Sequence, residues 1–122
     1  MSLIGCRILV LEDEPLLAFD YADELTDRGA TPSVVHTVRE ALNAVSEDMP
    51  DLAVLDVNLG HKFCWPVAEM LTGRGVPFYL VSGCVMKGRI PVGIEPEDCL
   101  EKPVGAHDLA DRLTGLARRL MK

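Results

Sequence analysis

The chain has 122 residues, 48% of them hydrophobic and 25% charged, which suits one globular domain and excludes a disordered or fibrous chain. Its formal net charge of -7 opposes binding to nucleic-acid phosphates or to anionic membranes. The sequence shows neither an apolar run that could span a bilayer nor a secretory signal at its start. We therefore expect a single domain over residues 1–122, in the cytoplasm, with neither nucleic acid nor membrane among its partners.

The first part of the chain alternates between strand and helix patterns. Residues 7–11 (RILVL) form a short apolar run, which predicts a buried strand. An amphipathic helix follows, opened by Pro15 and closed by Gly29, with Tyr21 on its apolar stripe. Residues 33–35 predict the second strand.

The second helix begins with a capping signal. Thr37 followed by Glu40 forms a capping box, and apolar residues then recur at helical spacing through Val45. Residues 52–55 predict the third strand, and Pro66 opens a third helix.

The last part of the chain is less regular. Residues 76–81 predict a fourth strand and residues 98–100 a weaker fifth. Between these two strands, glycines and prolines interrupt any helical pattern, so we expect the fourth helix to be short or irregular. Leucines at helical spacing over 109–120 predict a final helix.

This alternation predicts an α/β fold. Strands that alternate with helices form right-handed crossovers, so we expect a five-stranded parallel sheet of flavodoxin-like order, 2-1-3-4-5, with helices on both faces. In such sheets, ligands bind beyond the carboxyl ends of the strands. The residues that end the strands are therefore the candidate functional residues.

Three carboxylates end two of the predicted strands. Glu12 and Asp13 follow the first strand, and Asp56 ends the third. These acids would repel one another unless a cation lay between them, and an all-oxygen ligand set favours Mg²⁺. We predict a Mg²⁺ site formed by Glu12, Asp13 and Asp56, with the backbone carbonyl of Asn58 as a further ligand.

Two other strand ends carry a hydroxyl and an ammonium group. Ser82 ends the fourth strand and Lys102 follows the fifth. A metal ion and an ammonium on either side of Asp56 would clamp a phosphoryl group, with the carboxylate as nucleophile and Ser82 as a hydrogen-bond donor. Each residue alone has an ordinary explanation as a turn or cap residue, but the combination at one sheet edge favours phosphoryl chemistry.

With these motifs the chain resembles the receiver domains of bacterial two-component response regulators. The resemblance rests on "VLEDE", "LAVLDVNLG", "LVSG" and "EKP", which occur in family order. A longer stretch is similar to a subgroup of stand-alone, single-domain receivers. The resemblance implies the following roles: Glu12 and Asp13 as the acidic metal pair, Asp56 as the phosphorylated aspartate, Asn58 as a carbonyl ligand, Ser82 as the switch hydroxyl and Lys102 as the phosphoryl-contacting lysine.

The resemblance also implies partners and a mode of action. A histidine kinase or a histidine phosphotransfer protein would donate the phosphoryl group, and phosphorylation would change the affinity for a downstream protein. Such a domain is not an enzyme beyond its own phosphorylation and dephosphorylation, and we expect a monomer or weak dimer.

Two departures keep an alternative open. The family usually has an aromatic residue three positions before the lysine, where this chain has Cys99, and the glycines and prolines between Cys84 and Glu97 interrupt the fourth helix that the family has there. The alternative is a receiver-like interaction module that signals without phosphorylation. A phosphohydrolase is disfavoured because Asn58 occupies the position where such enzymes need an acid. The four cysteines are widely scattered and predict reduced thiols, not a zinc site or disulfides.

Overall fold

The structure is a computed structural model that describes residues 3–83 and 89–120. One five-stranded parallel sheet has the order β2-β1-β3-β6-β7, which confirms the predicted 2-1-3-4-5 arrangement of the sheet strands. The sheet consists of β1 (Arg7–Leu11), β2 (Thr31–Val35), β3 (Leu52–Asp56), β6 (Phe78–Ser82) and β7 (Asp98–Glu101). The helices are α1 (Pro15–Asp27), α2 (Val38–Glu47), α3 (Trp65–Gly73) and α4 (Ala106–Leu120).

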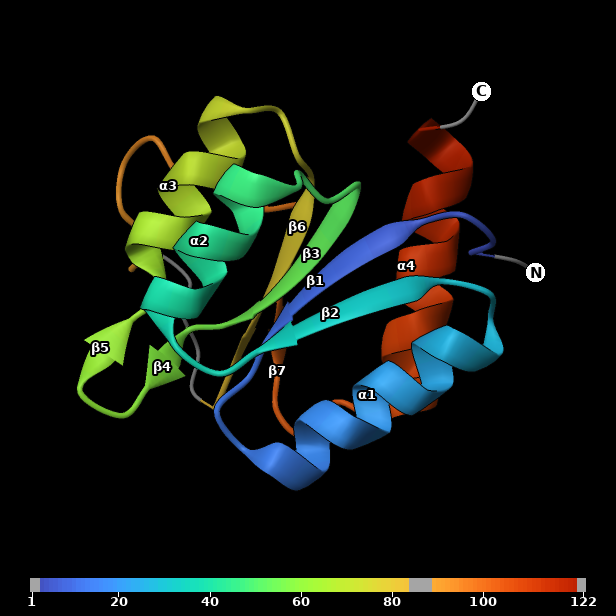
Figure 1. The fold of residues 1–122 in the computed structure, drawn as a ribbon. Coiled ribbons are helices and arrows are strands. Elements are labelled where there is room, and N and C mark those ends of the chain that lie inside the picture. The colour runs from blue at the N-terminus through green and yellow to red at the C-terminus, as the bar shows by residue number, and fades with distance from the viewer. Residues whose placement is uncertain (1–2, 84–88, 121–122) are drawn as a thin grey trace.

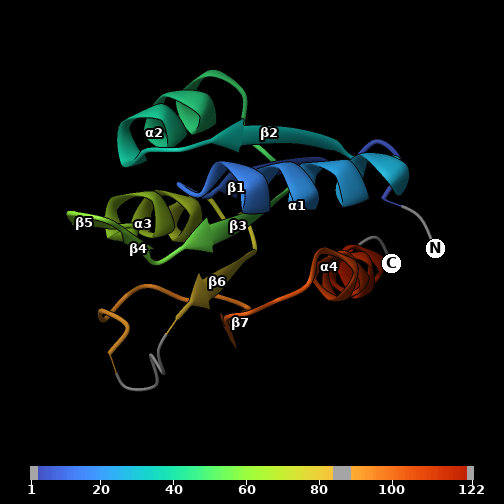
Figure 2. The same ribbon diagram turned by 90° about the horizontal axis from the view of Figure 1, so that it is seen from below.

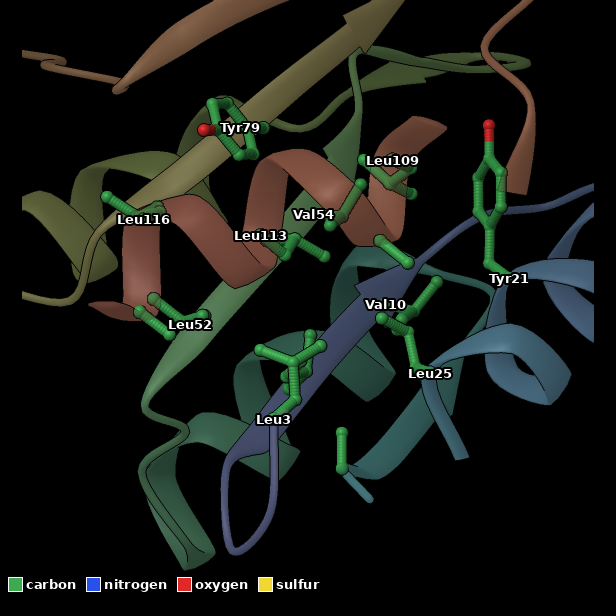
Figure 3. Close-up of a cluster of buried hydrophobic side chains, with 14 of the residues drawn as sticks. Leu3, Val10, Tyr21, Leu25, Leu52, Val54, Tyr79, Leu109, Leu113 and Leu116 are labelled. Atoms are coloured by element: carbon green, nitrogen blue, oxygen red, sulfur yellow. The ribbon is translucent and has the colours of Figure 1, made fainter. Parts of the chain in front are cut away.

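Helices cover both faces of the sheet. Figures 1 and 2 show α2 and α3 on one face and α1 and α4 on the other. Each face has its own hydrophobic cluster: β-strand residues pack with Ala41 and Leu71 on the first face, and with Leu25 and Leu113 on the second. Figure 3 shows the second cluster, between the sheet and α1 and α4. This double coverage explains why the central strands β1, β3 and β6 are apolar along most of their length, with polar residues at their ends.

The register of the sheet brings the strand ends to one edge. Asp56 of β3 pairs with Val81 of β6, and Ser82 pairs with Glu101 of β7. Every residue of β3 and β6 is buried, including the polar residues at their ends. The sheet therefore holds Asp56 and Ser82 as rigid, nearly buried groups at its carboxyl edge.

A short hairpin follows β3 and was not predicted. β4 (Asn58–Leu59) pairs with β5 (Lys62–Phe63) in antiparallel fashion, and the turn between them contains Gly60 with a φ of 77°. A positive φ of this kind favours glycine. The hairpin links the end of β3 to the start of α3.

The other comparisons with the sequence prediction concern element boundaries and the described part of the irregular segment before β7. Residues 89–97 contain turns and no helix, in agreement with the expected irregular segment, while Cys84 and Gly88 lie outside the described residues. The fourth strand begins at Phe78, two residues later than predicted. Leu120 is 54% exposed, so the buried stripe of the last helix ends before it. No helix in the described ranges is long and apolar enough to cross a membrane.

Candidate functional site

Three carboxylates meet at the carboxyl edge of the sheet. Glu12 directly follows β1 and is 2% exposed, Asp56 ends β3 and is 4% exposed, and Asp13 is open to solvent. One ligand atom from each of these residues lies within 4.8 Å of those of the other two. An all-oxygen set of this kind, with one solvent-facing member, suits a hard divalent cation.

Lys102 bridges the two buried carboxylates. Its Nζ atom lies 3.3 Å from Oε1 of Glu12 and 3.3 Å from Oδ2 of Asp56. Burial acts to lower the pKa of Lys102, but the charges of Asp56 and Glu12 outweigh burial and raise it. The ammonium group therefore stays charged and partly compensates the two acids.

The charge of Asp56 is disfavoured in this pocket. Burial and the neighbouring charge of Glu12 raise the pKa of Asp56 to about 7, although Lys102 acts in the opposite direction. Two buried carboxylates share one ammonium group, so the pocket retains an excess of negative charge. A bound cation would relieve that excess.

Backbone groups hold Glu12 in place. Its Oε2 atom accepts a hydrogen bond of 3.1 Å from the backbone nitrogen of Glu14. The backbone nitrogen of Glu12 donates to Val35 at 3.0 Å, and its carbonyl oxygen lies 2.9 Å from Nδ1 of His36. Because a carbonyl oxygen only accepts, this contact requires the tautomer or charge state of His36 with a proton on Nδ1.

The other residues singled out from the sequence lie at the end of β6, in β4 and in β7. Ser82 is 3% exposed, and its carbonyl oxygen accepts a hydrogen bond of 2.7 Å from the backbone nitrogen of Lys102. Asn58 begins β4, two residues after Asp56, and its carbonyl remains a predicted ligand. Cys99 lies in β7, partly buried against the cluster under α2 and α3. The structure thus brings the predicted acids and Lys102 together.

The structure adds two buried side chains that the sequence patterns did not single out for this site. Cys64, just before α3, is fully buried, and burial together with the charge of Asp56 raises the pKa of its thiol to about 12. Burial and the charges of Glu12 and Asp56 also raise the pKa of Tyr21 in α1. The hydroxyl of Tyr21 donates a hydrogen bond to the backbone carbonyl of Val104. A tyrosine on a buried helical stripe was the available signal, since its hydroxyl requires a partner.

A doubly covered parallel sheet with an acidic cluster and a lysine at its carboxyl edge defines a receiver-like domain. A comparison with models of known protein families finds no match. The chain is 35% identical over 127 residues to the transcriptional regulatory protein TcrA of Mycobacterium tuberculosis, in a match that covers 94% of the chain and 47% of TcrA. The chain spans about half the length of the curated relatives it matches.

Solved structures agree on the fold. A CheY-like response regulator receiver domain protein from Methanospirillum hungatei superimposes with a TM-score of 0.84 at 19% identity, covering 93% of this chain and 94% of that one. The response regulator TrrA of Thermotoga maritima, solved in complex with Mg²⁺-BeF, gives a TM-score of 0.78 at 20% identity, covering 95% and 99%. The chain is also 31% identical over 122 residues to the DNA-binding response regulator MtrA of Mycolicibacterium smegmatis, in a match that covers 98% of the chain and 54% of MtrA. The chain belongs to the receiver domains of two-component response regulators.

Proposed function

We propose that Asp56 accepts a phosphoryl group from a phosphohistidine of a histidine kinase or a histidine phosphotransfer protein. One observation carries the proposal: Asp56 ends a buried strand, with ligand atoms of Glu12 and Asp13 within 4.8 Å and the ammonium group of Lys102 3.3 Å from its Oδ2 atom. Isolated turn or cap residues have no physical reason to form this constellation.

The transfer exchanges one bond to phosphorus for another. A carboxylate oxygen of Asp56 attacks the phosphorus atom, and the bond between phosphorus and the imidazole nitrogen of the donor breaks. The electron pair of that bond returns to the donor imidazole. Lys102 stabilises the charge on the phosphoryl oxygens, and Ser82, at the end of the neighbouring strand, is the proposed donor to one of them.

Mg²⁺ is the proposed cofactor. Glu12, Asp13 and Asp56 would hold it, together with the backbone carbonyl of Asn58. When bound, Mg²⁺ neutralises charge and orients phosphoryl oxygens. Two observations support it: the three acids form the one cluster of potential metal ligands within the described ranges, and TrrA was solved with Mg²⁺-BeF.

Phosphorylation would act as a conformational switch. The added charge would draw Ser82 and Lys102 toward Asp56 and change the loops after β3 and β6, and with them the affinity for a protein partner. The domain would work in the cytoplasm as a signalling protein, catalysing at most its own phosphorylation and dephosphorylation. The complete pocket gives no support to a module that signals without phosphorylation.

Intact mass spectrometry tests the proposal. The purified protein is incubated with acetyl phosphate and Mg²⁺, and the mass is followed with time. We expect one added phosphoryl group, which is absent in Asp56→Asn and after chelation of the metal. An adduct that persists in Asp56→Asn would refute the proposed acceptor.

A further inference from the structure

Tyr21 is a buried residue of α1 whose hydroxyl bonds to a distant loop. Its side chain is 1% exposed and packs in the cluster that also contains Val10 and Leu109. Figure 3 shows the ring extending from α1, with the hydroxyl at its far end. This hydroxyl donates a hydrogen bond of 3.0 Å to the carbonyl oxygen of Val104. A phenylalanine would fill the same apolar space without this hydrogen bond, so the hydroxyl adds a link to the loop that packing alone does not supply.

Val104 belongs to the segment that delivers Lys102 to the acidic cluster. Two residues before it, the backbone nitrogen of Lys102 donates to Ser82 at 2.7 Å. The segment is therefore held at two points, to β6 through the backbone of Lys102 and to α1 through the hydroxyl of Tyr21. The Lys102 side chain extends from the first of these points to Glu12 and Asp56.

The hydrogen bond from the Tyr21 hydroxyl to Val104, here called the tether, does not depend on pH near neutrality. Burial, together with the charges of Glu12 and Asp56, raises the pKa of Tyr21 to about 12. The hydroxyl therefore stays protonated at neutral pH and remains a hydrogen-bond donor.

We propose that Tyr21 is a positioning residue: its hydroxyl fixes the backbone after Lys102 so that the ammonium group meets the phosphoryl group on Asp56. A lysine side chain has many rotamers, and a fixed backbone reduces the positions that its ammonium group can occupy. This inference rests on the proposed phosphoacceptor function. It assigns to α1 a part in transfer that does not involve contact with the phosphoryl group.

Tyr79 provides a matched control. It belongs to the same cluster, and its hydroxyl also donates to a backbone oxygen, that of Arg112 at 3.3 Å. This acceptor lies within α4 and not beside Lys102. Tyr21→Phe and Tyr79→Phe therefore remove the same group from the same core, and only the first removes the tether.

The kinetic test measures transfer and metal binding separately. With acetyl phosphate and saturating Mg²⁺, we expect the phosphorylation rate to fall about fivefold in Tyr21→Phe, as loss of one hydrogen bond implies, and to change less than about twofold in Tyr79→Phe. Mg²⁺ affinity, followed by the fluorescence of the single tryptophan, Trp65, should not weaken, because the Tyr21 hydroxyl bonds to no proposed metal ligand and a less fixed ammonium group leaves more negative charge on Glu12 and Asp56. Equal rate losses in both variants, or weaker Mg²⁺ binding in Tyr21→Phe, would overturn the positioning role.

A second measurement does not depend on phosphorylation. In the unphosphorylated protein, we expect the Cε and Hε NMR resonances of Lys102 to shift in Tyr21→Phe and to stay in place in Tyr79→Phe. If the wild type takes up no phosphoryl group, the proposed function fails, and these resonances still decide the role of Tyr21. Unchanged Lys102 resonances in Tyr21→Phe would overturn it.

Discussion

The surroundings of Asp56 in the folded protein disfavour its ionised form. In the unfolded chain an aspartate titrates near pH ~3.9, whereas burial and Glu12 raise its pKa to about 7 in the folded protein. Between these values the folded state binds more protons than the unfolded state. The free energy of unfolding therefore falls as the pH rises through this window.

This linkage predicts a pH-dependent effect of Asp56→Asn. Without metal, we expect the variant to be more stable than the wild type by about 2–4 kcal/mol at pH ~8, and this difference to shrink toward pH ~5. Urea unfolding in the presence of a chelator, at both pH values, measures it. A difference that is the same at both pH values would contradict the raised pKa of Asp56.

The role of Tyr21 shows where residue-level prediction from sequence stops. The apolar stripe correctly predicted that Tyr21 faces the core. Its hydroxyl partner is 83 positions away, and only the packing of α1 beside the β7–α4 connection brings the two together. By contrast, Glu12, Asp56 and Lys102 could be predicted to meet, because parallel strands end at one edge.

Among the helices and strands, the capping box and the helical spacing predicted α2 well, whereas no sequence pattern predicted the β4–β5 hairpin. Thr37 accepts a hydrogen bond from the backbone nitrogen of Glu40, as expected of a cap, while the Glu40 carboxylate accepts from His36, one residue before the cap. Strands of two residues, such as β4 and β5, are too short to show a period. The sequence pattern therefore missed the hairpin beside Asp56.

Replacing two different glycines with alanine should change the free energy of unfolding in opposite directions. Gly115 lies on the exposed side of α4, where an added Cβ would meet open space, so Gly115→Ala should raise the free energy of unfolding by about 0.5–1 kcal/mol. Gly29 follows α1 with a φ of 91°, and its Cβ would lie 2.6 Å from Cγ1 of Ile4. Gly29→Ala should therefore lower it by about 1 kcal/mol or more. Urea unfolding measures both, and changes of the same sign would contradict this account of the two helix positions.

For the complete domain, the fold was predictable because the central strands β1, β3 and β6 are largely buried apolar runs between helical patterns, while the edge strands β2 and β7 are more exposed. The handedness of the crossovers limits the possible strand orders, and the order fixes which strand ends are neighbours. The boundaries of the irregular segment before β7 were not predictable, since glycine and proline exclude a helix without specifying what replaces it.

Metal binding should couple the site to the stability of the whole domain. A ligand that binds only the folded state stabilises it, by about 2.7 kcal/mol at one hundred times its dissociation constant. We expect Mg²⁺ to raise the melting temperature saturably, with a much weaker response in Asp13→Asn. Asp20→Asn is the matched control, because it removes the same charge from an exposed position of α1. Equal responses in the two variants would contradict the assignment of Asp13.

Chemical trapping identifies the carboxylate that carries the phosphoryl group, which we propose to be that of Asp56. After phosphorylation with acetyl phosphate and Mg²⁺, borohydride reduces an acyl phosphate to the alcohol, which converts a phosphorylated aspartate into homoserine, and peptide mass spectrometry then locates the change. We expect homoserine at position 56 and at no other aspartate position. Reduction at another carboxylate, or none in a folded protein that has gained a phosphoryl group, would contradict it.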